Sequence, residues 1–245
     1  MGYEMSHPLE IDTSRSERAA FIRRTYAHLA GAILAFVAIE TMIFGVIRQM
    51  NPPAFEQVLS SLFQSRFSWL IVMVAFMGVS YLANYWAFNG GSPALQYAGL
   101  SLYVVAEALI FVPILYVAMY LTPSEPGRQY ELVTQAGILT LCLFAGLTAV
   151  VFTTGKDFSF LAPIISIAGF VALGVIICAI IFGFTLGLFF SLAMIVLASA
   201  AILYDTSNIL HKFRMDQHVA ASLSLFASVA LLFYYVLLAL MQSRR

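Results

Sequence analysis

Charge is scarce in this chain of 245 residues. Asp, Glu, Lys and Arg make up only 10% of it, whereas an ordinary globular domain carries roughly 25%. Residues 158–204 contain none of these four residue types and no His. The formal net charge is zero, so nothing favours a nucleic-acid partner. This composition excludes a soluble domain.

Cysteine is also scarce, and the signatures of known enzyme classes are missing. Cys142 and Cys178 both lie in apolar runs, which favours packing over a disulfide or a metal pair. His28, His211 and His218 have no metal-ligand spacing with the acids, and we expect them at the membrane interface. The chain has no Ser-His-Asp order, phosphate loop, dinucleotide fingerprint or zinc signature. We therefore expect no enzyme activity, no resident cofactor and no firm metal site.

Apolar sequence is abundant, at 62% of residues with a mean hydropathy of +0.92. A membrane-spanning helix needs about 20 apolar residues, and the spans must be helices because lipid offers no water to their backbone groups. Seven stretches fit, over residues 26–47, 69–88, 95–121, 132–152, 160–182, 187–207 and 219–241. The uncharged run is divided at its glycines, residues 183–187. Six spans and a re-entrant segment are the alternative.

The polar N-terminal segment, residues 1–22, is expected to be a flexible tail ahead of a single transmembrane domain over 23–245. The positive-inside rule sets the orientation of the spans. With the N-terminus inside, Lys and Arg number seven on the inner side and five on the outer side, namely Arg15, Arg18, Arg23, Arg24, Lys156, Lys212 and Arg214 against Arg48, Arg66, Arg128, Arg244 and Arg245. This excess predicts a cytoplasmic N-terminus.

Three acids lie within the predicted spans: Glu40, Glu107 and Asp205. A charged residue at a helix centre costs roughly 2.5–3.5 kcal/mol on insertion scales, so such acids mark functional sites by default. All three are candidates for sensing or conducting protons or ions. The alternatives are structural. Asp205 would link two helices or cap its own span, Glu40 would be protonated in the interior, and Glu107 would bond backbone groups freed by Pro113.

Helical spacing gives Asp205 specific neighbours. Ala198 precedes it by seven positions and Asn208 follows it by three, so its face of the helix is narrow and suits close contact with another helix. Ser224 and Ser228 lie four positions apart on the last span and share one face of it. The hydroxyls of these two serines are the candidate partners for the Asp205 carboxylate.

Residues 201–209 read Ala-Ile-Leu-Tyr-Asp-Thr-Ser-Asn-Ile and resemble the sixth-helix signature of the Bax inhibitor-1 family. Three further segments are similar to that family: Arg-Arg-Thr-Tyr at 23–26, Thr-Gly-Lys-Asp-Phe-Ser-Phe-Leu at 154–161 and Ser-Leu-Ser-Leu-Phe at 222–226. The spacing agrees over nearly the whole chain after the tail. Within the family, residues 205–209 followed by His211 look most like the bacterial YccA-like branch.

The resemblance implies an all-α fold of seven helices in which six surround a central one. It also implies a proton-sensitive leak of calcium, gated by two Asp residues on the last two helices. Asp205 matches the first Asp, but the second position is Ser228, which cannot share a proton as a carboxylate does. A basic residue that some members carry near the end of the second helix, around 89–90, is absent too. Both departures count against a two-acid pH gate.

The YccA-like branch also lacks the second acid, and its members are implicated as partners and modulators of the membrane-bound ATP-dependent protease FtsH. We therefore predict a multi-pass protein of the bacterial inner membrane that modulates FtsH, with the lipid bilayer and FtsH as partners. The alternative is a pH-sensitive calcium or cation leak channel, or a proton-coupled exchanger that uses the buried carboxylates, with Ca²⁺ transported or weakly bound. A structural membrane protein is a third reading. The sequence leaves the oligomeric state open.

Overall fold

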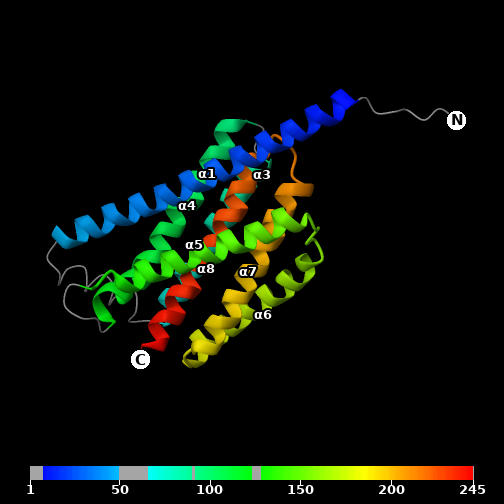
Figure 1. Ribbon diagram of the computed structural model, residues 1–245. Coiled ribbons are helices and arrows are strands. Elements are labelled where there is room, and N and C mark those ends of the chain that lie inside the picture. Colours follow the sequence, from blue (N-terminus) through cyan, green and yellow to red (C-terminus); the bar gives the residue numbers. More distant parts are fainter. Residues whose placement is uncertain (1–7, 50–65, 90–91, 123–127, 245) are drawn as a thin grey trace.

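The computed structural model of the chain describes residues 8–49, 66–89, 92–122 and 128–244. Seven helices in this part are long and apolar enough to cross a membrane (Figure 1). They are α1 (Pro8–Gln49), α3 (Arg66–Asn89), α4 (Pro93–Tyr116), α5 (Glu131–Thr154), α6 (Leu161–Phe182), α7 (Leu188–His211) and α8 (His218–Ser243). The prediction of seven spans is confirmed. The uncharged run divides where its glycines stand, with α6 ending at a left-handed Gly183 and α7 starting after Gly187.

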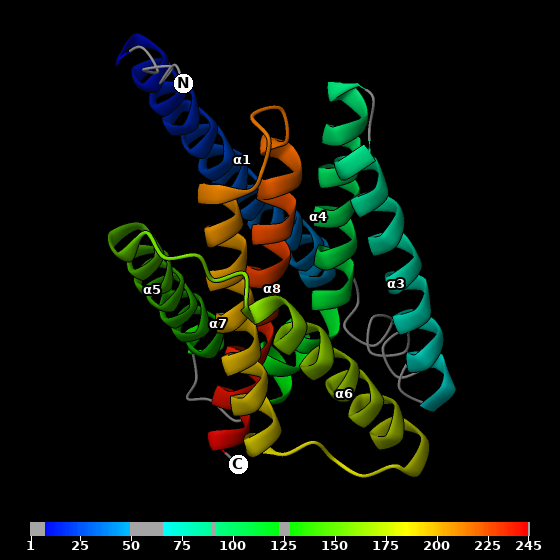
Figure 2. The same cartoon turned by 90° about the vertical axis from the view of Figure 1, so that its right-hand side faces the viewer.

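The last helix, α8, is the centre of the bundle. It packs against α1, α3, α4, α5 and α7, while α6 lies against α7 and α3. Figure 2 shows α8 enclosed by these neighbours, with α3 and α6 on the outside. Leu223, Leu232 and Leu237 along α8 are fully buried. The central helix is therefore the one that carries Ser228.

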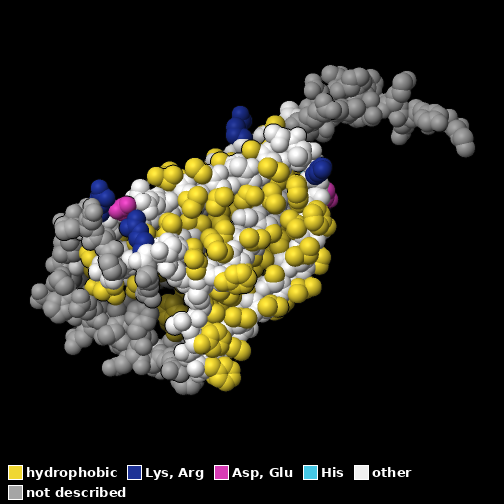
Figure 3. Space-filling model, turned by 60° about the horizontal axis from the view of Figure 1, so that its bottom comes forward, with side chains coloured by type: hydrophobic (Ala, Val, Ile, Leu, Met, Phe, Trp, Pro, Cys, Tyr) yellow, Lys and Arg dark blue, Asp and Glu magenta, His cyan; other side chains and the backbone are white. Residues whose placement is uncertain are grey.

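Apolar side chains cover the middle of the molecule. On the face in Figure 3 they form a broad belt, and the Lys, Arg, Asp and Glu side chains lie at its edges. Phe170 on α6 and Phe189 on α7 are 76% and 87% exposed. An apolar surface of this extent is a lipid-facing surface rather than a single contact patch.

The N-terminal segment differs from its prediction. Residues 8–22 belong to α1, which begins at Pro8, so this stretch is helical rather than the expected flexible tail, and residues 1–7 lie outside the described part. Two contacts hold its later part, around residues 18–21, against the bundle. The Arg18 guanidinium donates to the Phe213 carbonyl at 2.7 Å, and the Phe21 ring is buried. The polar composition of residues 1–22 could not predict contacts with segments far away in the chain.

The fourth helix changes form after its proline. Pro113 lies inside α4, and the chain continues as a short π-helix, η1 (Val117–Leu121). Its wider turn ends where the Thr122 backbone and hydroxyl both donate to the Val117 carbonyl, at 2.9 and 3.0 Å. π-Helical turns inside α-helices occur frequently at functional sites.

Candidate functional site

Asp205 and Ser228 form the contact at the centre of the site. Asp205 is half-buried in the C-terminal half of α7, and Ser228 is buried on the adjoining face of α8. The Ser228 hydroxyl donates to Asp205 Oδ2 at 2.6 Å, a short O–H···O hydrogen bond. The fully buried Ala198 and Ala221 keep this part of the bundle narrow. The sequence predicted this contact through helical spacing.

Ser224, the other candidate partner, and Asn208, the polar residue one turn after Asp205, are placed differently. The Ser224 hydroxyl donates to the Ala220 carbonyl of its own helix at 3.3 Å. The side-chain oxygen of Asn208 is buried and has no hydrogen-bond partner within the described segments. Of the two candidate serines, the structure brings Ser228 to the Asp205 carboxylate.

Glu107 connects to this contact through a cavity. It is buried on α4 and accepts a hydrogen bond from the Tyr103 hydroxyl, one turn earlier on the same helix. Glu107 and Ser228 both line a pocket of about 400 Å³ bounded by α3, α4, α6 and α8. Tyr103 is thus the contact observed for Glu107, where the sequence suggested backbone groups freed by Pro113. Ser228 therefore bonds Asp205 and also lines a mostly apolar pocket that Glu107 lines from α4.

Glu40 lies apart from Asp205, Ser228 and Glu107. It is 7% exposed on α1, and neither carboxylate oxygen has a hydrogen-bond partner in the part of the chain that the structure describes. It lines a separate pocket of about 420 Å³, among residues of α1, α4 with η1, α5 and α8. The structure therefore groups two of the three predicted acids and separates the third.

The loop between α5 and α6 docks beside the site. The Ser207 hydroxyl, two positions after Asp205, accepts from the Phe158 amide at 2.9 Å and donates to Asp157 Oδ1 at 3.3 Å. This loop belongs to the segment 154–161 that carries part of the family resemblance. It ties α7 to the start of α6 next to the buried acid.

Asp157 itself is exposed and organises the loop. Its carboxylate accepts from the Ser159 hydroxyl and from the Ser159 amide, the latter at 2.9 Å. These hydrogen bonds hold the pKa of Asp157 below its ordinary value of 3.8, and the nearby Lys212 and Ser207 lower it further. The sequence did not single out Asp157 or Ser207 as functional. Their only signal was membership of the family-like segment.

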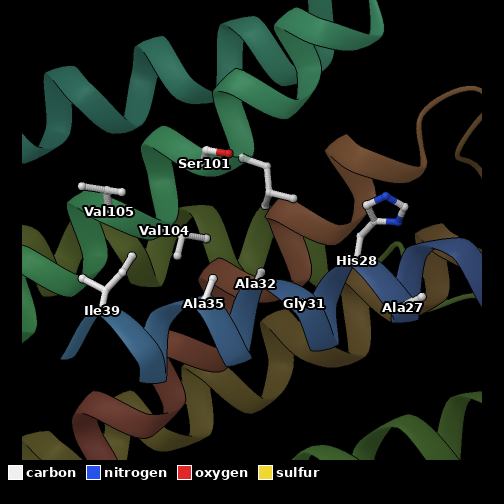
Figure 4. Close-up of a pocket in the computed structure, with 10 residues that line it drawn as sticks. Ala27, His28, Gly31, Ala32, Ala35, Ile39, Ser101, Val104 and Val105 are labelled. Carbon is white, nitrogen blue, oxygen red and sulfur yellow. The ribbon is translucent and has the colours of Figure 1, made fainter. Parts of the chain in front are cut away.

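His28 and His218 lie side by side at the end of the bundle where α8 begins. His28 Nε2 lies 2.9 Å from the Tyr97 hydroxyl, and its ring stands 5.0 Å from that of His218. Figure 4 shows His28 at one end of an apolar groove between α1 and α4, whose walls are small side chains such as Ala32 and Ala35. Within the described residues, no group of three His, Cys, Asp or Glu is placed to hold a metal ion.

Comparison with known proteins identifies the family of this chain. A family model described as "Inhibitor of apoptosis-promoting Bax1" matches residues 18–245. The chain belongs to the Bax inhibitor-1 family. In this member of the Bax inhibitor-1 family, the residue that meets Asp205 from the last helix is a serine.

Two relatives illustrate the breadth of the Bax inhibitor-1 family. The uncharacterized protein PA2604 of Pseudomonas aeruginosa is 37% identical over 120 residues, which cover 49% of this chain and 52% of that protein. The BI1-like protein of Arabidopsis thaliana is 34% identical over 126 residues, 46% of each chain. This chain thus spans about half the length of the curated relatives it matches. No solved structure matches it significantly.

Proposed function

We propose that this protein is a cation leak pathway or proton-coupled exchanger of a bacterial inner membrane, centred on Asp205. The observation that carries the proposal is the 2.6 Å hydrogen bond from Ser228 to Asp205, at the edge of a cavity that also holds Glu107. The Asp205 carboxylate offers a site for a proton or a cation such as Ca²⁺, and Glu107, which lines the same cavity as Ser228, offers a second.

The energetics support a functional reason for the acid. An Asp at the centre of a membrane helix costs roughly 2.5–3.5 kcal/mol, whereas a hydrogen bond between membrane helices contributes about 0.6 kcal/mol on average and about 1.7 at most. Asp205 lies near the C-terminal end of α7, where the cost is lower than at the centre, and the Ser228 hydroxyl offsets part of it. If position 205 served only to join α7 to α8, a small or hydroxylated residue there would do so at a lower cost in free energy than an Asp.

The serine also sets how the site responds to protons. A hydroxyl both donates and accepts, so Ser228 can donate to ionised Asp205 and accept from its protonated form. Neither state places two negative charges side by side. The proposed pathway therefore depends less steeply on pH than one gated by two carboxylates.

The proposed orientation puts Asp205 in the cytoplasmic half of the membrane. The N-terminus of α1 and the C-terminus of α7 lie at the same end of the bundle (Figure 2). That end carries Lys and Arg residues on several loops and helix ends, among them Arg18, Arg23, Arg24, Lys156, Lys212 and Arg214. By the positive-inside rule this end is cytoplasmic.

Ion flux from reconstituted vesicles tests the proposal. Purified protein in calcium-loaded vesicles should release the ion, and Asp205→Asn should reduce the release at least tenfold, because the amide binds neither cation nor proton as the carboxylate does. Asp216→Asn, at an exposed acid of the α7–α8 loop, serves as the matched control. Equal release from wild type and Asp205→Asn would refute the pathway.

Modulation of FtsH is a second candidate, favoured by the shape of α1. Figure 1 shows its first turns extending beyond the ends of the other helices, where a partner at the membrane surface has access to them. Removing residues 1–15 leaves the Arg18 contact with Phe213 in place. This truncation should abolish crosslinked co-purification with FtsH while the thermal unfolding midpoint stays unchanged. Undiminished co-purification would rule out this segment as the contact.

A further inference from the structure

The pocket around Glu40 has the properties of a small-molecule site. Its volume of about 420 Å³ lies within the usual range for ligand pockets, about 300–1,000 Å³. Glu40 is more than nine-tenths buried in it, and both carboxylate oxygens are without a hydrogen-bond partner among the described residues. A buried carboxylate is stabilised by a positive charge. The described part of the pocket wall has no Lys or Arg to supply one.

Aromatic rings form much of the wall around this acid. Phe36 and Phe44 come from α1, Tyr130 from the start of α5 and Phe233 from α8. The faces of such rings attract cations, most strongly where water is excluded, and aromatic cages around an acid are a recurrent way to bind quaternary ammonium groups. The pocket thus combines one buried carboxyl group that has no hydrogen-bond partner among the described residues with a weakly polar, cation-attracting lining.

An inorganic dication suits the pocket poorly. Ca²⁺ takes six to eight oxygen ligands, and the lining offers one carboxylate with two hydroxyl groups, those of Thr41 and Tyr130. The Thr41 hydroxyl is already bonded to the Val37 carbonyl at 2.7 Å. A weakly hydrated organic cation needs no such shell of oxygens.

Part of the pocket wall belongs to the apolar outer surface of the bundle. Val37, which lines it, is 52% exposed on the apolar outer surface, and Thr41 and Gly45 on the same stretch of α1 are exposed too. A second pocket of about 220 Å³ shares Phe36 and Phe233 with it and is almost wholly apolar. A ligand with apolar groups can therefore reach the pocket from the bilayer.

We propose that this pocket binds a lipophilic organic cation, with its charge on Glu40 and its apolar groups against the aromatic rings and in the adjoining pocket. The site is separate from the Asp205 region, so the proposal does not depend on ion conduction. The partner chemistry is a hydrophobic ammonium or phosphonium ion rather than a metal ion.

Equilibrium binding of tetraphenylphosphonium to the full chain in detergent tests the proposal. Wild type should bind this permanent cation saturably, and Glu40→Gln should weaken binding at least tenfold. Glu107→Gln and Asp205→Asn are the matched controls, because each removes a buried acid outside the pocket and should leave binding unchanged. The neutral triphenylphosphine oxide should bind wild type and Glu40→Gln equally and weakly.

Two further variants keep the test decisive if Glu40→Gln folds poorly. Glu40→Asp retains the charge and should keep most of the binding, while Phe233→Leu removes one ring and should weaken it several-fold. Equal affinity of wild type and Glu40→Gln for the phosphonium would overturn the proposal, and so would the absence of saturable binding. Loss of binding in Asp205→Asn alone would move the site to the other acid region and equally refute it.

Discussion

Asp205 and Glu40 are both acids on apolar helices, yet the structure treats them differently. Asp205 is half-buried and receives a hydroxyl from the neighbouring helix at 2.6 Å. Glu40 is more deeply buried and meets no donor among the described residues, only an aromatic pocket. Glu107 is intermediate, since its donor, Tyr103, lies on its own helix. Asp205 is thus part of a contact between two helices, whereas Glu40 lines a pocket in which a ligand could bind its carboxyl group.

The largest expected effect comes from restoring a second acid beside the first. Ser228→Asp would place two carboxylates where a hydroxyl now meets Asp205, and adjacent carboxylates cannot both carry charge without repulsion. The pair would share a proton at low pH and lose it as the pH rises, which would push α7 and α8 apart. Vesicle flux should therefore rise with pH much more steeply than in wild type.

A matched control for that variant is Ser224→Asp, one turn away on α8, where the hydroxyl bonds its own helix. It should leave the pH profile of the flux close to that of wild type. Identical profiles for Ser228→Asp and wild type would mean that position 228 does not face the ion pathway.

A smaller effect concerns stability and compares the two acids directly. Ser228→Ala removes the donor and should lower the free energy of unfolding by about 0.6–1.7 kcal/mol, the range for hydrogen bonds between membrane helices. Glu40→Gln breaks no observed hydrogen bond and should leave stability unchanged or slightly higher. Unfolding in detergent by sodium dodecyl sulfate titration measures both. Equal destabilisation by the two substitutions would contradict the distinction between the sites.

The smallest effect lies in the loop that docks beside Asp205. Hydrogen bonds lower the pKa of Asp157 in the folded protein below its ordinary value of 3.8. The ionised carboxylate therefore stabilises the loop at every pH above 3.8, and this contribution is lost as the pH falls through the lower pKa of the folded state. Hydrogen exchange at the Phe158 amide should lose protection in that acidic range. Asp157→Asn should remove this pH step, whereas Asp216→Asn should retain it. A step that survives in Asp157→Asn would assign the titration to another group.

Much of the fold could be predicted because hydrophobic length is a strong signal. Seven apolar stretches gave the seven spans, and the glycines at 183–187 gave the division of the uncharged run. The helical start of α1 could not be predicted in the same way. Polar residues look alike in a tail and in an exposed helix, and the contact of Arg18 with Phe213 joins residues far apart in the chain.

The site shows the same limit at the level of single residues. Helical spacing offered Ser224 and Ser228 together as partners for Asp205, and the packing of α7 against α8 selects Ser228. The separation of Glu40 from Glu107 depends on how α1 and α4 pack, which no local pattern encodes. Asp157 and Ser207 meet across a loop, and only their place in or beside family-like segments marked them.

Flux measured through a double-mutant cycle tests most directly whether Asp205 and Ser228 act as one unit. Calcium release from vesicles should fall in Ser228→Ala and fall further in Asp205→Asn. Adding Ser228→Ala to Asp205→Asn should change nothing more, because the hydroxyl acts through the carboxylate it bonds. Independent, additive losses from the two substitutions would show that the residues act separately and would contradict a pathway centred on their contact.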